Sequence, residues 1–236
     1  MSAIGVRWSI VSLGMSCQTA LQINHNIPFL RTLLNDDTML LRACPFDWLV
    51  APVESVTQLL QRWEFYPSSP EDFSINQRPY WGAANVYYWH DFKTGNPIEE
   101  FDDIKKKFAH TAENLRWVTK SQRTLFLVSN TQNNLVTDMA SVGTFDPVIR
   151  SSSLAALNVQ LRARFHRDFH LALITHPDRY IRDTEHEFFS VEHIEKDHSE
   201  WEGSPYNWQQ ALTRLAGRLL SKKKSRLRPA QPHLNP

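Results

Sequence analysis

Residues 8–17 have the sequence WSIVSLGMSC, and this stretch decides the fold class. The apolar run at its start predicts a buried β-strand, because β-branched and aromatic residues favour a pleated surface. Gly14 predicts a tight turn behind this strand. Cys17 then falls on the first turn of a helix that continues through Ile23. The stretch is therefore the expected opening unit of a layered α/β domain.

Cys17 is the first candidate functional residue. The first backbone N–H groups of a helix have no intrahelical partner, and the helix dipole is positive at this end. Both effects favour a thiolate over a thiol, so the position predicts a reactive cysteine. The same N–H groups are suited to bind an oxyanion. The competing interpretation is a small, buried and unreactive cysteine at a strand–helix junction.

Composition limits the class of protein. The chain has 236 residues, of which 42% are hydrophobic, enough to bury a sizeable core. A net charge of +1 argues against nucleic acid or an anionic membrane as a partner. No apolar stretch of about 18 residues predicts a membrane span, and no secretion signal is recognised. The two cysteines, Cys17 and Cys44, favour a reducing, cytoplasmic location over a disulfide framework.

The remaining pattern alternates apolar runs with helical spacing, which is typical of an α/β fold. A proline and an Asn-Asp-Asp cluster are expected to interrupt regular secondary structure over residues 28–37. Residues 66–82 are expected to form an ordered loop. Helices are predicted at 52–63, 97–120, 152–165 and 206–220, and strands at 86–92, 124–129, 169–175 and 188–194. We expect three layers, with a mostly parallel central sheet flanked by helices. Residues 1–220 would form a single domain, and residues 221–236 a basic, proline-rich, disordered tail.

In open α/β sheets, ligands bind at the carboxyl ends of the strands. Cys17, His90 and Asn130 are all predicted to lie at such ends. Phosphate-binding and dinucleotide-binding glycine loops are absent from the sequence, so no nucleotide cofactor is expected.

Three motifs carry a resemblance to a known family. They are Ser12-Leu13-Gly14-x-x-Cys17-x-x-Ala20, Pro45-Phe46-Asp47-Trp48 and His90-Asp91-Phe92. Together they resemble the bacterial DUF1796 group of papain-like cysteine peptidases over about the first hundred residues. The segment Trp201-x-Gly203 followed by Trp208 is similar to the end of such domains. The resemblance implies cysteine chemistry and, as an alternative fold, a papain-like α+β arrangement.

The resemblance implies a role for each matching residue. Cys17 would be the nucleophile, and His90 its general base and later the acid for the leaving group. The group that orients the imidazole would be Asp47 or Asn130, and the sequence does not choose between them. Asp91 follows His90 on an extended segment, where neighbouring side chains point to opposite faces, and is poorly placed for this role.

The oxyanion would be held by backbone N–H groups around Ser16 and Cys17, with the Gln18 side chain as a further contributor. Trp48 is a further candidate binding residue, although a large aromatic side chain in this motif is also expected to lie in the core. Other residues also have structural interpretations: Asp47 as a cap or anchor of the turn before the helix at 52, Asn130 as a turn residue, and Cys44 as packing.

The expected function is thus a cysteine-dependent hydrolase or acyltransferase of the papain-like peptidase class, acting on an amide, ester or thioester. Its substrate would be an acyl, peptide or saccharide-linked compound of unknown identity, and the oligomeric state is left open. One alternative is an SGNH-like esterase using Ser12 or Ser16 with His193 or His198, although the expected Asp-x-x-His is missing near residues 204–207. Another is a non-catalytic saccharide-binding or interaction domain built on the aromatic residues between Tyr66 and Trp89.

Metal binding is not expected. His166 and His170 are four residues apart, as in zinc-binding helices, but lack the adjacent acid of a His-Glu-x-x-His motif and span a predicted helix-to-strand break. His186, His193 and His198 lie in an acidic stretch that predicts a solvated surface.

Overall fold

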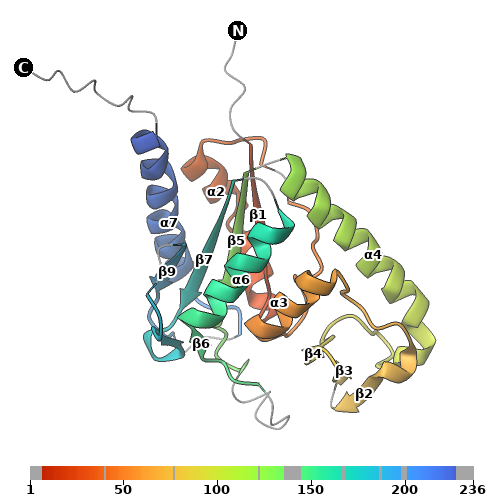
Figure 1. The fold of residues 1–236 in the computed structure, drawn as a ribbon. Coiled ribbons are helices and arrows are strands. Elements are labelled where there is room, and N and C mark those ends of the chain that lie inside the picture. Colours follow the sequence, from red (N-terminus) through yellow and green to blue (C-terminus); the bar gives the residue numbers. More distant parts are fainter. Residues whose placement is uncertain are drawn as a thin grey trace, which may run out of the picture.

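The centre of the molecule is a four-stranded parallel sheet in the order β1-β5-β7-β9 (Figure 1). The computed structural model describes residues 7–39, 41–76, 78–121, 123–135, 145–165, 168–185, 188–197 and 201–226. The strands are β1 (Trp8–Ser12), β5 (Arg123–Ser129), β7 (Phe169–Thr175) and β9 (Phe189–His193). Helices cover both faces, which confirms the predicted three-layer α/β fold rather than the α+β alternative.

The two faces of the sheet bury separate clusters of side chains, because successive residues of a strand point to opposite sides. Phe126 and Val128 of β5 face one cluster, and Leu125 and Leu127 face the other. The first cluster includes residues of α3 (Val53–Arg62), α4 (Pro97–Ser121) and α6 (Ser151–Arg164). The second includes residues of α1 (Cys17–His25), α2 (Ile27–Leu34) and α7 (Pro205–Arg226). Continuous apolar runs such as β5 are thus explained by burial on both faces.

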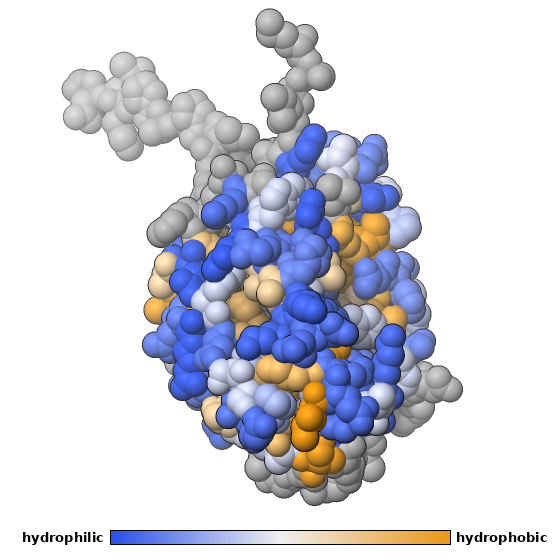
Figure 2. Space-filling model, turned by 90° about the vertical axis from the view of Figure 1, so that its right-hand side faces the viewer, coloured by the Kyte–Doolittle hydropathy of each residue, from blue (hydrophilic) through white to orange (hydrophobic). Residues whose placement is uncertain are grey.

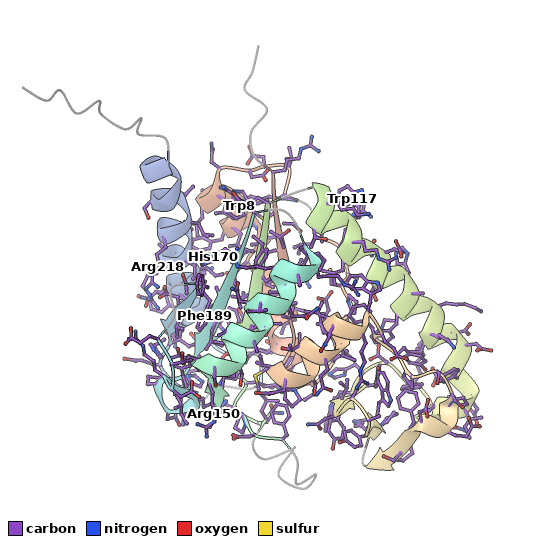
Figure 3. All side chains as sticks on the ribbon, viewed as in Figure 1. Trp8, Trp117, Arg150, His170, Phe189 and Arg218 are labelled. Carbon is purple, nitrogen blue, oxygen red and sulfur yellow. The ribbon has the colours of Figure 1, made fainter. Side chains whose placement is uncertain are left out.

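The outer surface carried by α4 is mostly hydrophilic, with smaller apolar patches low on the same face (Figure 2). The amino ends of the strands and the carboxyl end of α4 lie together at one end of the molecule, where Trp8 and Trp117 are found (Figure 3). The small sheet described next lies at the opposite end (Figure 1). Across the described ranges, no helix is both long and apolar enough to cross a bilayer.

A second, antiparallel sheet has the order β2-β3-β4 and was not predicted. It consists of β2 (Phe73–Asn76), β3 (Arg78–Trp81) and β4 (Val86–Tyr87), after a short 3₁₀ helix, η1 (Pro70–Asp72). Most of residues 66–82 therefore belong to regular structure rather than to a loop. Aromatic rings connect this sheet to α4: the ring centroid of Phe73 in β2 lies 6.4 Å from that of Phe101 and 5.5 Å from that of Tyr66, which stacks on Phe108 at 5.4 Å. A two-stranded parallel pair is formed by β6 (Ile149–Arg150) and β8 (Tyr180–Ile181). A second 3₁₀ helix, η2 (Pro177–Arg179), lies directly before β8.

Three further predictions are corrected. The break at residues 28–37 is instead α2, because Pro28 lies in the first turn, where its missing N–H is not needed. The strand predicted at 86–92 is limited to β4, and residues 89–91 form a turn. The tail does not begin at 221, since α7 continues to Arg226. The rest of the predicted tail, residues 227–236, lies outside the described residues.

Candidate functional site

The turn between β1 and α1 positions Cys17. Gly14 has φ +82° and Met15 has φ +64°, so two successive residues adopt the left-handed conformation. Ser16 is extended and caps α1, which begins at Cys17. A Cβ at Gly14 would lie 3.7 Å from Phe46, an ordinary contact, so glycine is favoured here by its backbone conformation rather than by space. The predicted strand, turn and helix are confirmed.

His90 reaches the site from the small antiparallel sheet, and not from the central parallel sheet as predicted. It lies in the turn after β4, whose Tyr87 exchanges two backbone hydrogen bonds with Val50, at 3.0 and 2.9 Å. This bridge brings Trp48 beside His90, with ring centroids 6.0 Å apart and an interplanar angle of 80°. Trp48 is 37% exposed, which corrects its expected place in the core.

The sulfur of Cys17 lies 3.6 Å from Nε2 of His90. This is the contact that the sequence motifs imply, and it joins residues 73 positions apart in the chain. Both side chains line one cavity of about 170 Å³. Cys17 is only 4% exposed, whereas His90 is exposed. A thiol, an imidazole and an open space for a reacting group therefore meet at one point, as nucleophilic catalysis requires.

The surroundings of the pair favour the neutral form of both groups. Burial raises the pKa of the Cys17 thiol from 9.0 to about 11, although the N–H groups of Cys17 and Gln18 act in the opposite direction. Desolvation lowers the pKa of His90 below 6.5, against the attraction of the Asp91 charge. The N–H groups at the start of α1 lower the pKa of the thiol, as predicted, but loss of solvent raises it by more, so the net shift is away from the thiolate.

Neither candidate for the orienting group is hydrogen-bonded to His90 among the described residues. Oδ2 of Asp47 accepts a bond from the backbone N–H of Cys44 at 2.8 Å, as in its turn-anchor interpretation. Burial raises the pKa of Asp47 to about 7. Nδ2 of Asn130 donates to the carbonyl oxygens of Pro147 and Arg179, at 2.7 and 2.8 Å. Asn130 thus ties loops together at the end of β5.

Asp91 acts on His90 through its charge. Its Oδ1 lies 2.5 Å from Nζ of Lys107, and no hydrogen bond joins it to the imidazole in the part of the chain described. The ring of Trp48, in a T-shaped arrangement with the imidazole, is a second contact besides the thiol that can orient His90.

Gln18 is not available to an oxyanion. Its Nε2 donates to the carbonyl oxygen of Trp201 at 2.6 Å, and its Oε1 accepts from Oγ1 of Thr131 at 2.7 Å. Its carboxamide thus holds two segments together behind Cys17. Oγ of Ser16 is buried and has no partner in the described structure. The candidate oxyanion donors that remain are the backbone N–H groups of Cys17 and Gln18, which act on the sulfur of Cys17.

Sequence reasoning missed most of the cavity wall. Besides Cys17 and His90, the wall consists of Val50, Trp89, Gln132, Asn134, Leu135 and Trp201. The only sequence signals were the Trp201-x-Gly203 motif and the polar run after β5. Their convergence on Cys17 depends on contacts between distant segments, which no local pattern contains.

The structure also places the residues of the alternative functions. Oγ of Ser12 accepts a bond from the N–H of Gly14 at 3.3 Å, and no described histidine is hydrogen-bonded to Ser12 or Ser16. His193 packs its ring against Tyr180, 6.0 Å away, and His198 lies outside the described residues. In the predicted saccharide surface, Trp81, Tyr87 and Tyr88 are buried.

Metal ligands are not gathered in the described ranges, where no group of three or more His, Cys, Asp or Glu residues could hold an ion. Nε2 of His170 lies 2.9 Å from Oγ of Ser190. His166 and His186 lie outside the described residues.

Comparison of the chain with protein-family models, curated proteins and solved structures gives no match. The inference of function therefore rests on the motifs and on the geometry of Cys17 and His90.

Proposed function

We propose that the protein is a cysteine-dependent hydrolase or acyltransferase that acts on an amide, ester or thioester. The observation that carries this proposal is the 3.6 Å separation between Sγ of Cys17 and Nε2 of His90 beside a cavity. The resemblance to papain-like cysteine peptidases supports the same class of chemistry. Both cysteines are free, which suits a reducing compartment such as the cytoplasm.

The reaction begins from the neutral pair. Nε2 of His90 takes the thiol proton while the sulfur of Cys17 forms a bond to the acyl carbon, and the carbonyl oxygen becomes negative. The N–H groups at the start of α1 stabilise this oxygen. When the intermediate collapses, the bond from the acyl carbon to the leaving group breaks, and His90 gives its proton to that group. Water or another acceptor then attacks the acyl-enzyme, again with His90 as base, and the thiol is restored.

Proton transfer has to accompany attack, because the pKa values of both groups favour the neutral forms at rest. His90 acts here as a general base and not as half of a stable ion pair. General base catalysis of this kind contributes about 10²–10⁴-fold to a rate. A substrate that excludes water from the cavity strengthens the local interactions of the developing charges.

Covalent trapping tests the proposal. The protein is incubated with a panel of acyl amides, esters and thioesters, quenched in acid, digested and analysed by mass spectrometry. We expect acyl mass on the peptide that carries Cys17, and release of product that is abolished in Cys17→Ser. Acyl mass confined to another residue, or equal product release by Cys17→Ser, would refute the proposal.

A further inference from the structure

One face of the small antiparallel sheet packs against the wall of the cavity beside Cys17. Tyr80 of β3 lies opposite Tyr87 of β4, and their rings stack with centroids 4.4 Å apart. Tyr87 forms a buried cluster with Val50 and Leu135, and Tyr80 packs against this cluster. Val50 and Leu135 also line the cavity. Because alternate residues of a strand share a face, the residues two positions further along each strand belong to the same face.

Arg78 and Trp89 occupy these next positions. The N–H of Tyr88 donates to the carbonyl oxygen of Pro79 at 3.0 Å, which continues the pairing of the two segments and brings Arg78 opposite Trp89. The guanidinium carbon of Arg78 lies 5.3 Å from the ring centroid of Trp89, which is a cation–π contact. Trp89 itself lines the cavity. Arg78 is therefore held against an indole that forms part of the cavity wall.

The charge of Arg78 also acts on the reacting pair. Besides desolvation, three charges change the pKa of His90: that of Asp91 raises it, and those of Arg78 and Lys107 lower it. The carboxylate of Asp91 lies 2.5 Å from Nζ of Lys107, so these two opposite charges offset each other. Within the described ranges, no ion pair joins the guanidinium of Arg78 to an acidic residue. The three charges around His90 therefore leave an excess of one positive charge.

The guanidinium of Arg78 is suited to bind an anion from solvent. Arg78 is exposed, so a ligand can reach it. Contact with the indole takes up a flat face of the guanidinium and leaves the N–H groups along its edge free to donate. A carboxylate matches this edge with two parallel hydrogen bonds. Apart from the reacting pair, the described residues that line the cavity of about 170 Å³ carry no formal charge, so Arg78 is the cation that a small anionic ligand would meet there.

We propose that Arg78, held by Trp89, binds a carboxylate group of the substrate beside the reacting thiol, so that the preferred substrates are compact acyl compounds with a negative charge. The inference rests on the proposed function for the role of Cys17. It goes further in naming the ionic class of the substrate and the residue that recognises it. Arg78 lies outside the sequence motifs, which therefore contain no signal for this site.

Two alkylating reagents test the carboxylate site without any turnover. Iodoacetate and iodoacetamide have nearly the same size and both alkylate a thiolate, but only iodoacetate carries a carboxylate. Their rates with Cys17 are measured in the Cys44→Ser variant at pH 9 and low salt, and each is divided by the rate with 2-mercaptoethanol. We expect the normalised rate of iodoacetate to exceed that of iodoacetamide by about tenfold, the effect of roughly one hydrogen bond to a charged group.

Protection from iodoacetamide identifies the kind of anion that binds. Succinamate and succinamide differ only in that succinamate has a carboxylate where succinamide has a second carboxamide. Succinamate should protect Cys17 about tenfold more effectively than succinamide, again the effect of roughly one hydrogen bond to a charged group. Inorganic phosphate serves as a further probe. Better protection by phosphate than by succinamate would overturn the assignment to a carboxylate.

Replacing single arginines assigns the preference to a residue. Arg78→Met should bring the ratio of the two normalised rates close to one. Arg164→Met is the matched control, because Arg164 also stacks on a tryptophan, 4.6 Å from the ring centroid of Trp63, which does not line the cavity. An unchanged ratio in folded Arg78→Met, or an equal loss in Arg164→Met, overturns the inference. A ratio of about one with the Arg78 side chain present also overturns it, even if a variant fails to fold.

The pKa of His90 provides an independent measurement of where Arg78 lies. Because the positive charge of Arg78 lowers this pKa, Arg78→Met should raise it, and Arg164→Met should leave it in place. NMR titration of the His90 ring measures the change in each variant. An unchanged pKa in Arg78→Met would place the guanidinium too far from the reacting pair and overturn the inference.

The outcomes also separate this inference from the proposed function. If the preference for iodoacetate depends on Arg78 but no acyl compound is turned over, the carboxylate site is supported and the proposed enzyme activity is refuted. If Cys17 becomes acylated and turns over neutral compounds in preference to their carboxylate-bearing counterparts, the enzyme proposal holds and the carboxylate site is overturned.

Discussion

Cys17 and Cys44 have almost the same burial and very different surroundings. They are 4% and 3% exposed, and desolvation raises the pKa of both thiols. Sγ of Cys44 donates to the carbonyl oxygen of Arg42 at 3.4 Å, and the charge of Asp47 raises the pKa of Cys44 further. Sγ of Cys17 instead lies 3.6 Å from an imidazole nitrogen that can accept its proton.

The difference shows what distinguishes a candidate nucleophile from a structural cysteine in this fold. Neither burial nor the resting pKa separates the two thiols, because both are held as thiols at neutral pH. What distinguishes Cys17 from Cys44 is the proton acceptor and the cavity beside its thiol. The two cysteines therefore provide a matched pair in one molecule, in which each can serve as the control for the other.

The largest expected effect comes from replacing the thiols one at a time. Cys17→Ser should lower the rate of acyl transfer by at least about 10³-fold, because the hydroxyl is a far weaker nucleophile in a site built for sulfur. Cys44→Ser should change the rate less than twofold. Steady-state kinetics on the best acyl substrate, with thermal melting to check folding, measures both. Equal losses in the two variants would erase the distinction between the sites.

Removing the proton acceptor should have the next largest effect. His90→Ala is expected to lower kcat by about 10²–10⁴-fold, the usual contribution of a general base. Its stability should change little, since His90 is exposed. Trp48→Phe keeps an aromatic edge beside the imidazole and serves as the milder control. If His90→Ala kept the parent rate, His90 would not be the proton acceptor of Cys17, and the contrast with Cys44 would lose its main support.

The fold and the position of the nucleophile could be predicted because their signals are local. The apolar run, Gly14 and the helical spacing after Cys17 lie within a few residues of one another, and the continuous apolar run of β5 directly indicates burial on both faces. The burial that controls the thiol is not local. It depends on segments packed over α1, so the sequence predicted the effect of the helix terminus correctly and missed the larger desolvation.

His90 was identified by a motif, but its route to the site was not. The β-forming residues 86–92 predicted a strand end of the open α/β sheet for it, whereas a two-residue strand of the small antiparallel sheet and the bridge between Val50 and Tyr87 position it. The placement of Asp47 also depends on contacts that the motif does not contain. The motif makes Asp47 a neighbour of Trp48 in sequence, but a hydrogen bond to Cys44 directs its carboxylate to the other cysteine.

The dependence of alkylation on pH sharpens the comparison of the two thiols. The raised pKa of Cys17, about 11, means that its thiolate fraction should keep increasing from pH 7 to beyond pH 9. A free thiol, with a pKa of about 8.5, approaches its full rate over this range. Iodoacetamide labelling of Cys17 in Cys44→Ser, followed by mass spectrometry, measures the midpoint. A midpoint below 8.5 would show that His90 holds a stable thiolate.

The acid side of the activity profile reports on His90. Because desolvation lowers its pKa below 6.5, the imidazole should stay neutral and active as pH falls from 8 toward 6.5. The rate of acyl transfer should decline only at lower pH, as the base becomes protonated. A decline that is already complete at pH 7 would contradict this assignment.

A backbone change tests the turn that positions Cys17. Gly14→Ala should cost about 1–2 kcal/mol of stability, because a side chain disfavours φ +82° while the space itself is sufficient. It should also lower activity by moving Cys17 relative to His90. Gly95→Ala is the matched control, since Gly95 has φ +74° and no atom within 4 Å of the added Cβ. Chemical denaturation should give similar losses for the two variants, and kinetics should separate them.

The smallest expected effect is at Asp47, on the Cys44 side. Its folded-state pKa of about 7 lies above the ordinary value of 3.8, so the folded protein holds this proton more tightly than the unfolded chain. The stability that results is present below pH 3.8 and is lost as pH rises through 7. Asp47→Asn keeps an oxygen acceptor for the N–H of Cys44 and removes the buried charge. The variant should be more stable than the parent at pH 8, by about 1 kcal/mol after solvent screening, with no gain at pH 4.

The same variant also decides whether Asp47 belongs to the catalytic site. Its carboxylate accepts a hydrogen bond from the backbone N–H of Cys44, and none to His90 is found among the described residues. The activity of Asp47→Asn should therefore stay within about twofold of the parent. An orienting carboxylate would give a much larger loss, because an amide in its place favours the wrong imidazole tautomer. Denaturation at pH 4 and pH 8, together with kinetics at pH 8, therefore assigns Asp47 either to the structural environment of Cys44 or to the reacting pair.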